Sequence, residues 1–330
     1  MSDKKKILEI NDLTIHYMTI DGTVRAVEDL NLSLNVGETL GLVGETGAGK
    51  TTSVKAIMQL LPHPPAKVLS GEILFKGEDI LKKTKREMRS IRGEKISMIF
   101  QDPMSSLNPV MTVSKQIEET IKLHNPKKSK KQIKEMADAM LETVGIKAER
   151  STDYPHQFSG GMKQRVVIAI ALACNPELII ADEPTTALDV TIQAQVLELM
   201  KKLREMHQTS MIMITHDLGV VADICDQVAI MYSGEVVEHG NRKHIFHNGL
   251  HPYTKGLFNC IPNLYEDERR LRPIKGLAPE AYNRIEGCRF HPRCPSAMEI
   301  CVKENPLTIE VEPGHTVKCH LYKEGMSFGE

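Results

Sequence analysis

Residues 44–51 read Gly-Glu-Thr-Gly-Ala-Gly-Lys-Thr and match the phosphate-binding pattern G-x-x-x-x-G-K-[ST]. The run Thr39–Val43 precedes this loop and predicts a short buried strand, and we expect a helix to begin near Gly49. A loop between strand and helix turns its backbone N–H groups toward phosphates, and the helix N-terminus adds the positive end of its dipole. The stretch therefore predicts an α/β fold that binds a nucleoside triphosphate.

The side chains of this loop have separate predicted roles. Lys50 supplies a point charge for the β- and γ-phosphates, and the hydroxyl of Thr51 is a ligand for Mg²⁺. The glycines allow a close backbone approach that a Cβ atom would block. The predicted ATP-binding residues here are Gly44, Glu45, Thr46, Gly47, Ala48, Gly49, Lys50, Thr51 and Thr52.

A second apolar run, Leu178–Ala181, ends in the acidic pair Asp182 and Glu183. A continuous apolar run is typical of a strand buried on both faces of a parallel sheet, and such sheets bind ligands at the carboxyl ends of their strands. We expect Asp182 to hold Mg²⁺ through water and Glu183 to polarise the attacking water, because phosphoryl transfer depends on positioning and charge stabilisation.

Between these two strings lies Phe158-Ser159-Gly160-Gly161-Met162, followed by Lys-Gln-Arg. This segment resembles the signature loop of the ATP-binding-cassette (ABC) ATPases. The resemblance implies that Ser159, Gly160, Gly161 and Met162 cover the γ-phosphate of ATP held by the opposite subunit. Most members of the family have Gln where this chain has Met162, and the departure is shared by the peptide-importer branch.

Other positions match the same family and take their roles from the resemblance. Tyr17 matches the aromatic residue that stacks on adenine, and Gln101 the glutamine that senses Mg²⁺ and the transport partner. Asp189, in the string Ala187-Leu188-Asp189, matches the loop that crosses the dimer interface, and His216 the histidine that contacts the γ-phosphate. The resemblance thus implies Glu183, His216 and Gln101 as catalytic residues, and Mg²⁺ held by Thr51, Gln101 and Asp182.

Three further strings narrow the resemblance to one branch. Residues 101–109 (QDPMSSLNP) are similar to the glutamine loop of oligopeptide and dipeptide importers, and residues 251–257 (HPYTKGL) and 287–294 (GCRFHPRC) to their C-terminal extension. Nickel and some oligosaccharide systems share this branch. The resemblance implies a second cassette, identical or related, two membrane permease subunits and, indirectly, an extracytoplasmic solute-binding protein.

Composition fits a globular ATPase that works with membrane partners. The chain has 330 residues, a formal net charge of −1, no Trp and 4% aromatic residues, which gives no argument for nucleic-acid binding. It has no apolar run near the ~18 residues that a spanning helix needs, and its N-terminus lacks a signal-peptide core. We therefore expect a cytoplasmic, peripheral position on the membrane, with the pore supplied by partner chains.

The chain as a whole predicts a P-loop ABC cassette with an appended segment. Residues 1–240 form the predicted cassette, with a mostly parallel sheet core and an antiparallel β subdomain; helical periodicity over about 102–158 predicts a helical subdomain. Residues 241–330 are expected to be an irregular, Cys-rich extension, since they hold five of the seven cysteines and eight of the 17 prolines. We expect the phosphate site to be built from residues before Gly240.

Four cysteines of the extension form a candidate metal site: Cys288, Cys294, Cys301 and Cys319. Disulfides are improbable in a reducing cytosol, and zinc sites usually contain cysteine pairs two to four residues apart, which this group lacks. Four thiolates suit a [4Fe–4S] cluster, which is the favoured interpretation. Zinc, or four thiols without a metal, are the alternatives.

Two other function classes are alternatives to peptide import. A soluble cassette ATPase that acts on ribosomes or DNA usually carries two cassettes in one chain or a long coiled coil, and an exporter ATPase is normally fused to spanning helices. Neither feature is found in this sequence. The peptide-type glutamine loop and C-terminal strings favour import, although the sequence does not name the solute.

Overall fold

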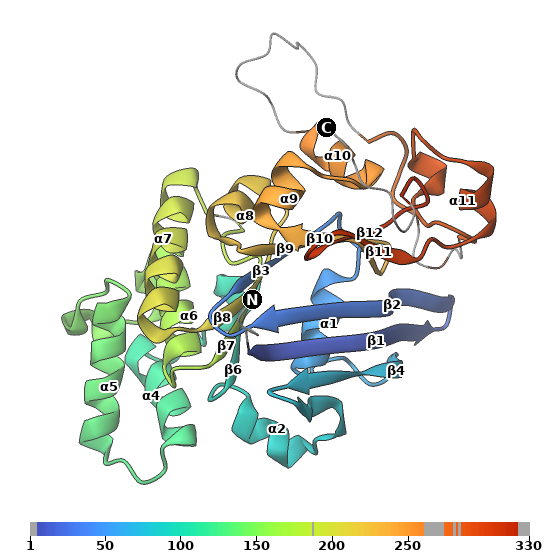
Figure 1. The fold of residues 1–330 in the computed structure, drawn as a ribbon. Coiled ribbons are helices and arrows are strands. Elements are labelled where there is room, and N and C mark those ends of the chain that lie inside the picture. The colour runs from blue at the N-terminus through green and yellow to red at the C-terminus, as the bar shows by residue number, and fades with distance from the viewer. Residues whose placement is uncertain (1–4, 187, 261–273, 280–281, 283–284, 323–330) are drawn as a thin grey trace. The chain divides into compact units, whose positions relative to one another are not determined.

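The computed structural model describes residues 5–186, 188–260, 274–279, 282 and 285–322 (Figure 1). Their contacts divide the chain into two compact units. The first contains residues 1–8, 33–39 and 74–215, and the second contains residues 9–32, 40–73 and 216–330.

Three parallel strands form the core of the first unit. They are β6 (Ile96–Ile99), β7 (Leu178–Asp182) and β8 (Ser210–Ile214), in the order β8-β7-β6. Every residue of the three strands is buried, as expected for a parallel sheet covered on both faces. The predicted acidic strand is confirmed, and Asp182 is its last residue.

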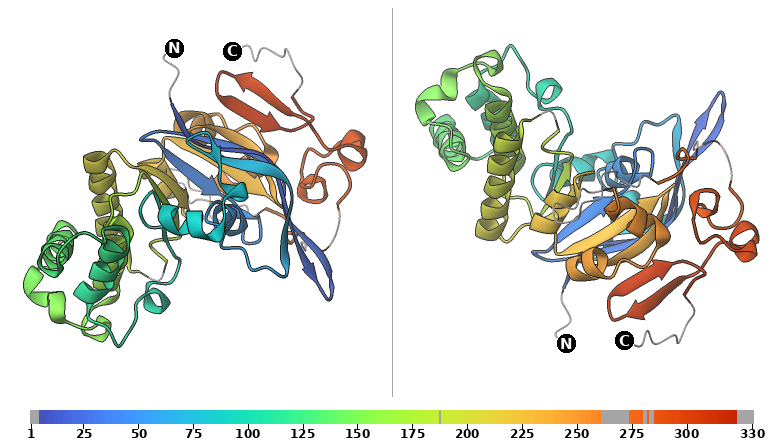
Figure 2. Two further views of the ribbon diagram at one scale, coloured as in Figure 1. Left: turned by 90° about the horizontal axis from the view of Figure 1, so that it is seen from below. Right: turned by 90° about the horizontal axis from the view of Figure 1, so that it is seen from above.

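Helices make up most of the rest of the first unit. α4 (Val113–His124), α5 (Lys130–Thr143) and α6 (Gly160–Leu172) pack on one another, and α7 (Val190–His207) packs on α6. Buried Val113, Ile117 and Ile121 lie on one face of α4 because they recur at a spacing of four. These helices, green to yellow in Figures 1 and 2, confirm the helical periodicity read from the sequence.

The second unit contains a mixed set of strands in the order β11-β12-β10-β9-β3. β3 (Thr39–Val43) is parallel to β9 (Gln227–Tyr232), whereas the remaining pairs are antiparallel. The unit also holds most of three further neighbouring strands, in the order β2-β1-β4. Their bounds, with those of the other strands, are β1 (Lys6–Thr19), β2 (Gly22–Asn35), β4 (Ala66–Phe75), β10 (Glu235–Asn241), β11 (Thr308–Glu312) and β12 (His315–Lys318).

Short helices and turns complete the described chain. Within these residues, no helix is long and apolar enough to cross a membrane. The remaining α-helices are α1 (Lys50–Ile57), α2 (Lys85–Ile91), α3 (Pro103–Ser106), α8 (Leu218–Ile224), α9 (Arg242–His247), α10 (Pro252–Phe258) and α11 (Glu299–Lys303). β5 (Glu78–Asp79) pairs with β4, and 3₁₀ turns lie at Ile80–Lys82, Ala148–Thr152, Pro155–Gln157 and His291–Arg293.

The C-terminal part is more regular than its composition predicts. β12 pairs with β10, with Glu238 opposite Val317, so a strand near the C-terminus joins the sheet of the second unit. The buried carboxylate of Glu238 accepts the backbone N–H groups of Leu250 (2.8 Å) and His251 (2.9 Å) and lies 2.8 Å from the imidazole Nε2 of His315. Hydrogen bonding offsets the cost of burying this charge, and it fixes the chain between α9 and α10 to the strands.

Candidate active site

The phosphate loop lies in the second unit, between β3 and α1, as predicted. Gly44, Gly47 and Gly49 have φ values of 156°, 84° and 100°, which L side chains rarely adopt. A Cβ atom on Gly44 would lie 2.2 Å from the carbonyl oxygen of Met231, and one on Gly49 would lie 2.4 Å from that of Ala26. The neighbouring backbone therefore requires glycine at both positions.

Lys50 and Tyr17, two predicted nucleotide-binding residues, both lie next to this loop or the helix that follows it. The buried Lys50 donates from Nζ to the carbonyl oxygens of Gly44 (2.6 Å) and Glu45 (3.0 Å), so its ammonium group lies against the start of the loop. Lys50 is also the first residue of α1, next to Thr51 and Thr52. The hydroxyl groups of Tyr17 and Thr52 are 3.4 Å apart, which places the predicted adenine-stacking ring beside the first turn of α1.

The predicted hydrolytic residues lie in the first unit. Asp182 is buried at the carboxyl end of β7, and Glu183 follows it with a φ of 49°. One carboxylate oxygen of Glu183 accepts a hydrogen bond from Gln101 Nε2 (2.8 Å) and another from the hydroxyl of Thr186 (3.0 Å). The structure thus brings Gln101 and Glu183 together although 82 positions separate them.

The signature segment begins α6, and its serine caps that helix. Ser159 is exposed, and its Oγ accepts the backbone N–H of Met162 at 3.4 Å. A hydroxyl that accepts a capping bond can still donate its own hydrogen to an anion. Gly161 is required by packing, since a Cβ there would lie 2.3 Å from Cγ2 of Ile192, whereas Gly160 is exposed.

Two other predicted site residues, Met162 and Asp189, make hydrogen bonds to residues close in sequence, and a third, His216, is exposed. The sulfur of Met162 accepts a hydrogen bond from Arg150 Nη1 at 3.4 Å. Asp189 caps α7 by accepting the backbone N–H of Ile192 at 2.9 Å, and Ala187 lies outside the described residues. His216 is exposed and is the second residue after β8.

Two residues from beyond Gly240 also contact the phosphate loop. The backbone N–H of Glu45 donates to the hydroxyl of Tyr253 in α10 at 2.9 Å. Arg293 donates to both carboxylate oxygens of Glu45, at 2.7 Å and 3.0 Å. The sequence predicts neither contact, although Tyr253 and Arg293 lie in the two strings that resemble the family's C-terminal extension.

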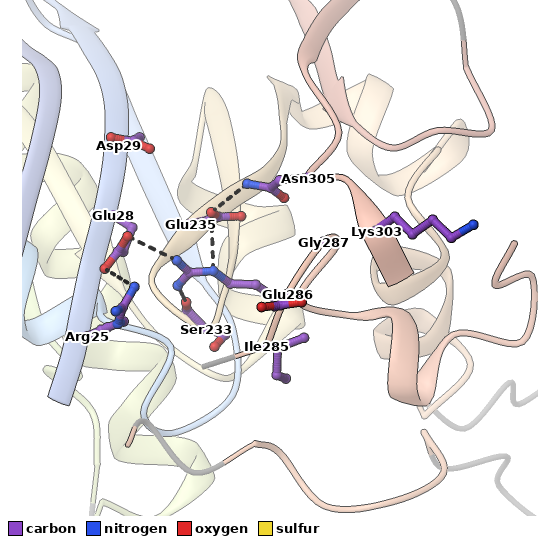
Figure 3. A pocket seen from close by; sticks show the side chains of 11 residues that line it. Arg25, Glu28, Asp29, Ser233, Glu235, Ile285, Glu286, Gly287, Lys303 and Asn305 are labelled. Carbon is purple, nitrogen blue, oxygen red and sulfur yellow. Dashed lines mark hydrogen bonds and ion pairs between the residues drawn. The ribbon is translucent and has the colours of Figure 1, made fainter. Parts of the chain in front are cut away.

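A polar pocket of about 450 Å³ lies elsewhere in the second unit (Figure 3). Arg289 is one of its lining residues and pairs with Glu28 at 3.3 Å and with Glu235 at 3.2 Å, and it donates to the carbonyl oxygen of Ser233. Asn305 donates to Glu235 at 3.1 Å. These paired charges hold the segment around Arg289 to β2 and to the β9–β10 turn. The remaining lining residues are Arg25, Asp29, Ile285, Glu286, Gly287 and Lys303.

The four cysteines of the candidate metal site, Cys288, Cys294, Cys301 and Cys319, all lie within the described residues. Burial raises the pKa of Cys288 to about 11, with further increases from Cys301 and Cys294. Burial likewise raises the pKa of Cys319 to about 11, and the other three thiols raise it further. Cys288 also donates its backbone N–H to the carbonyl oxygen of Cys301 at 2.8 Å. In the described ranges, however, no three or more His, Cys, Asp or Glu residues form a group that could hold a metal ion.

Two family models match separate parts of the sequence. Residues 27–186 match the ABC transporter model, and residues 237–301 match the model of the C-terminal region of oligopeptide/dipeptide transporters. The first match contains the phosphate loop, the signature segment and the acidic pair. The second contains Tyr253, Arg293 and three of the four cysteines.

Characterised relatives match over nearly the whole chain. The sequence is 49% identical over 319 residues to the dipeptide transport ATP-binding protein DppD of Bacillus subtilis, which covers 96% of this chain and 95% of that protein. It is 48% identical over 315 residues to the oligopeptide transport ATP-binding protein OppD of Salmonella typhimurium, covering 95% and 93%. Among solved structures, the dimeric ATP-binding cassette MJ0796 bound to ADP and Pi matches with a TM-score of 0.64 and 28% identity, over 71% of this chain and 98% of that one.

Proposed function

Because this chain belongs to the ATP-binding subunits of the oligopeptide and dipeptide ABC transporters, we propose that it hydrolyses ATP within a dimer of cassettes and so drives the import of short peptides. The observation that carries this proposal is the combination, in one chain, of a complete phosphate loop and signature segment with the matched C-terminal region.

The phosphate loop binds the nucleotide in this proposal. The N–H groups of Glu45 and Ala48 donate within the chain. The other backbone N–H groups of the loop and the N-terminus of α1 face the phosphates in this proposal, and Lys50 places a positive charge beside them. Tyr17 stacks on adenine. Thr51, Gln101 and Asp182 have the oxygen atoms that Mg²⁺ prefers, and the ion when bound offsets charge on the phosphate oxygens.

Glu183 acts as the water-orienting residue. Its carboxylate accepts bonds from Gln101 and Thr186 on one oxygen, so both side chains fix its direction. A carboxylate held in this way can accept a hydrogen bond from the attacking water and align it with the γ-phosphate. His216 contributes a contact to the γ-phosphate.

A second cassette completes each site in the proposed cycle. Ser159 and the N-terminus of α6 approach ATP held by the partner cassette, with Gly160 and Gly161 allowing close backbone contact and Asp189 lying at the interface. The dimeric state of the cassette MJ0796 bound to ADP and Pi supports this arrangement. The predicted division of the chain, a cassette over residues 1–240 and an extension over 241–330, belongs to the same proposal.

The proposed partners lie in and beyond the membrane. Two permease subunits form the pore, a solute-binding protein delivers the peptide, and this chain binds at the cytoplasmic face. The names of the relatives, which specify dipeptide and oligopeptide transport, support peptides over nickel or oligosaccharides.

We also propose a [4Fe–4S] cluster on Cys288, Cys294, Cys301 and Cys319. The support for this proposal is that four cysteine thiolates are the donors such a cluster uses. The described residues do not hold these cysteines as a group that could ligate a metal ion. The cluster when bound supplies a cross-link between parts of the extension. Zinc remains the alternative to be distinguished by elemental analysis.

The function is tested with the assembled transporter. The chain is purified with its permease subunits, and ATP hydrolysis is measured with peptides, nickel ions or oligosaccharides delivered by the cognate binding protein. We expect short peptides, but neither nickel ions nor oligosaccharides, to stimulate ATP hydrolysis. Stimulation by nickel or by an oligosaccharide, but not by peptides, would assign another solute to the same ATPase.

A further inference from the structure

One residue of the phosphate loop is held from outside the cassette by both its backbone and its side chain. Arg293 bonds to the two carboxylate oxygens of Glu45 in a fork geometry, at 2.7 Å and 3.0 Å. The side chain of Arg293 is only 7% exposed, and that of Glu45 is 29% exposed. Bidentate pairs that are partly shielded from water define geometry more strongly than exposed single contacts.

The second contact fixes the backbone of the same residue. Tyr253 is fully buried, and its hydroxyl accepts the N–H of Glu45 at 2.9 Å. Its ring packs on those of Tyr232 and Phe290, at centroid distances of 4.7 Å and 5.4 Å. The hydroxyl is therefore held in place by an aromatic cluster, and burial raises the pKa of Tyr253, so it stays protonated at neutral pH.

These contacts matter because the loop itself is rich in glycine. Gly44 precedes Glu45 and Gly47 follows two positions later, and both have positive φ values that few other residues allow. Lys50 donates to the carbonyl oxygen of Glu45, so the position of residue 45 also determines where the ammonium group of Lys50 lies. An interaction that fixes Glu45 therefore fixes the main cation of the phosphate site.

The negative charge of Glu45 is a second reason why its contact with Arg293 matters for ATP binding. Glu45 places a carboxylate within the loop that is proposed to bind the polyphosphate of ATP, and like charges at close range disfavour binding. The guanidinium group of Arg293 donates to both oxygens of that carboxylate and so neutralises its charge. Removing Arg293 would leave this negative charge unpaired beside the nucleotide.

We propose that Arg293 is a positioning residue for the ATP site, which acts through Glu45 to hold the phosphate loop and cancel its charge, so that the C-terminal extension tunes nucleotide affinity. This inference rests on the proposed function, because it assumes that the loop binds ATP. Arg293 lies next to Cys294, so the extension reaches the loop directly from its cysteine-containing segment.

The test measures the binding of methylanthraniloyl-ATP to the full chain by fluorescence, together with KM and kcat for ATP hydrolysis. Arg293→Ala is expected to raise Kd and KM about tenfold with a smaller change in kcat, and Arg293→Lys to restore part of the loss because charge remains without the fork. The matched control is Lys318→Ala, which removes another shielded cation of the extension. Lys318 pairs with Glu235 at 3.1 Å and has a side chain 13% exposed, so its loss should leave Kd within about twofold.

A double variant separates positioning from general damage. If Arg293 acts through Glu45, Arg293→Ala should weaken binding much less when Glu45→Gln is already present, because no carboxylate remains to be paired. Equal losses in the two backgrounds, an unchanged Kd in Arg293→Ala, or the same loss in Lys318→Ala would each overturn the inference. Failure of the wild-type chain to bind the nucleotide would instead contradict the proposed function.

Discussion

Gln101 donates a hydrogen bond from Nε2 to Oε2 of Glu183 across 2.8 Å, and this bond joins the second residue after β6 to the first residue after β7. Thr186 donates to the same oxygen at 3.0 Å. Both donors act on one carboxylate oxygen. The pairing supports the proposal that Gln101 and Glu183 act as a unit, with Gln101 able to alter the direction of the carboxylate.

Glu183→Gln should bind ATP but hydrolyse it at least about a hundredfold more slowly, since the loss of a water-orienting carboxylate raises the barrier by several kcal/mol. The phosphate loop is unchanged in this variant, so a closed, ATP-bound dimer of cassettes should accumulate. ATPase assays and size-exclusion chromatography with ATP check the two outcomes. Near-normal turnover would remove Glu183 from this role.

Ser159→Arg should hydrolyse ATP poorly while the isolated chain keeps its affinity for ATP. A long cation at the start of α6 blocks the close approach that Gly160 allows, and the proposed target of this segment is nucleotide held by the partner cassette. Ser159→Ala is the control variant with a small side chain, and it should lose less ATPase activity than Ser159→Arg. A collapse of ATP affinity in the monomeric Ser159→Arg chain would show that the segment serves its own site.

Stability should fall as the pH drops below about 6.5. Burial lowers the pKa of His251 from 6.5 to about 4, and the nearby Glu238 only partly opposes this shift. The unfolded chain therefore takes up a proton between pH 6.5 and 4 that the folded chain does not, which removes up to about 3 kcal/mol of stability across this window. Nδ1 of His251 accepts the backbone N–H of Tyr253, which requires the unprotonated nitrogen.

Thermal unfolding at pH 7.5 and pH 5 measures this dependence. The wild-type chain should lose more stability than His251→Gln, whose amide oxygen can accept the same bond without titrating. The same pH dependence in both proteins would assign the effect to other groups.

Protein purified without oxygen should contain iron and acid-labile sulfide, near four of each per chain, if the cysteine group holds a cubane cluster. Cys301→Ser should abolish this content and make residues beyond about Gly240 sensitive to protease, because the metal supplies ordering energy. Cys260→Ser is the matched control and should keep its iron. Stoichiometric zinc would favour the alternative, and metal-free protein with four alkylatable thiols would contradict both assignments.

Local patterns predicted the parts of the fold that depend on local sequence. The run Leu178–Ala181 is apolar throughout because β7 is buried on both faces. The glycines of the phosphate loop are required by their backbone angles and, at Gly44 and Gly49, by close neighbours as well. Regular spacing of apolar residues likewise predicted α4 and α5. Each of these features can be recognised from a segment of about fifteen residues of sequence.

No local sequence pattern indicates the long-range polar contacts. Arg293 and Glu45 are 248 positions apart, and Glu238 and His315 are 77 apart. Their residue types are common on surfaces, so the sequence alone gave no reason to pair them. For the same reason the joining of β12 to β10 was not predicted, because a four-residue strand such as His315–Lys318 has too little pattern to indicate its partner.

The central claim, that ATP hydrolysis by this chain powers peptide import, is tested most directly by uptake of a labelled tripeptide into proteoliposomes that contain the complete transporter. The wild-type complex with ATP enclosed on the side of the cassettes and binding protein outside should accumulate the peptide, and the Glu183→Gln complex, assembled to the same extent, should not. Equal uptake by the two complexes, or no ATP-dependent uptake of any short peptide by the wild-type complex, would contradict the account.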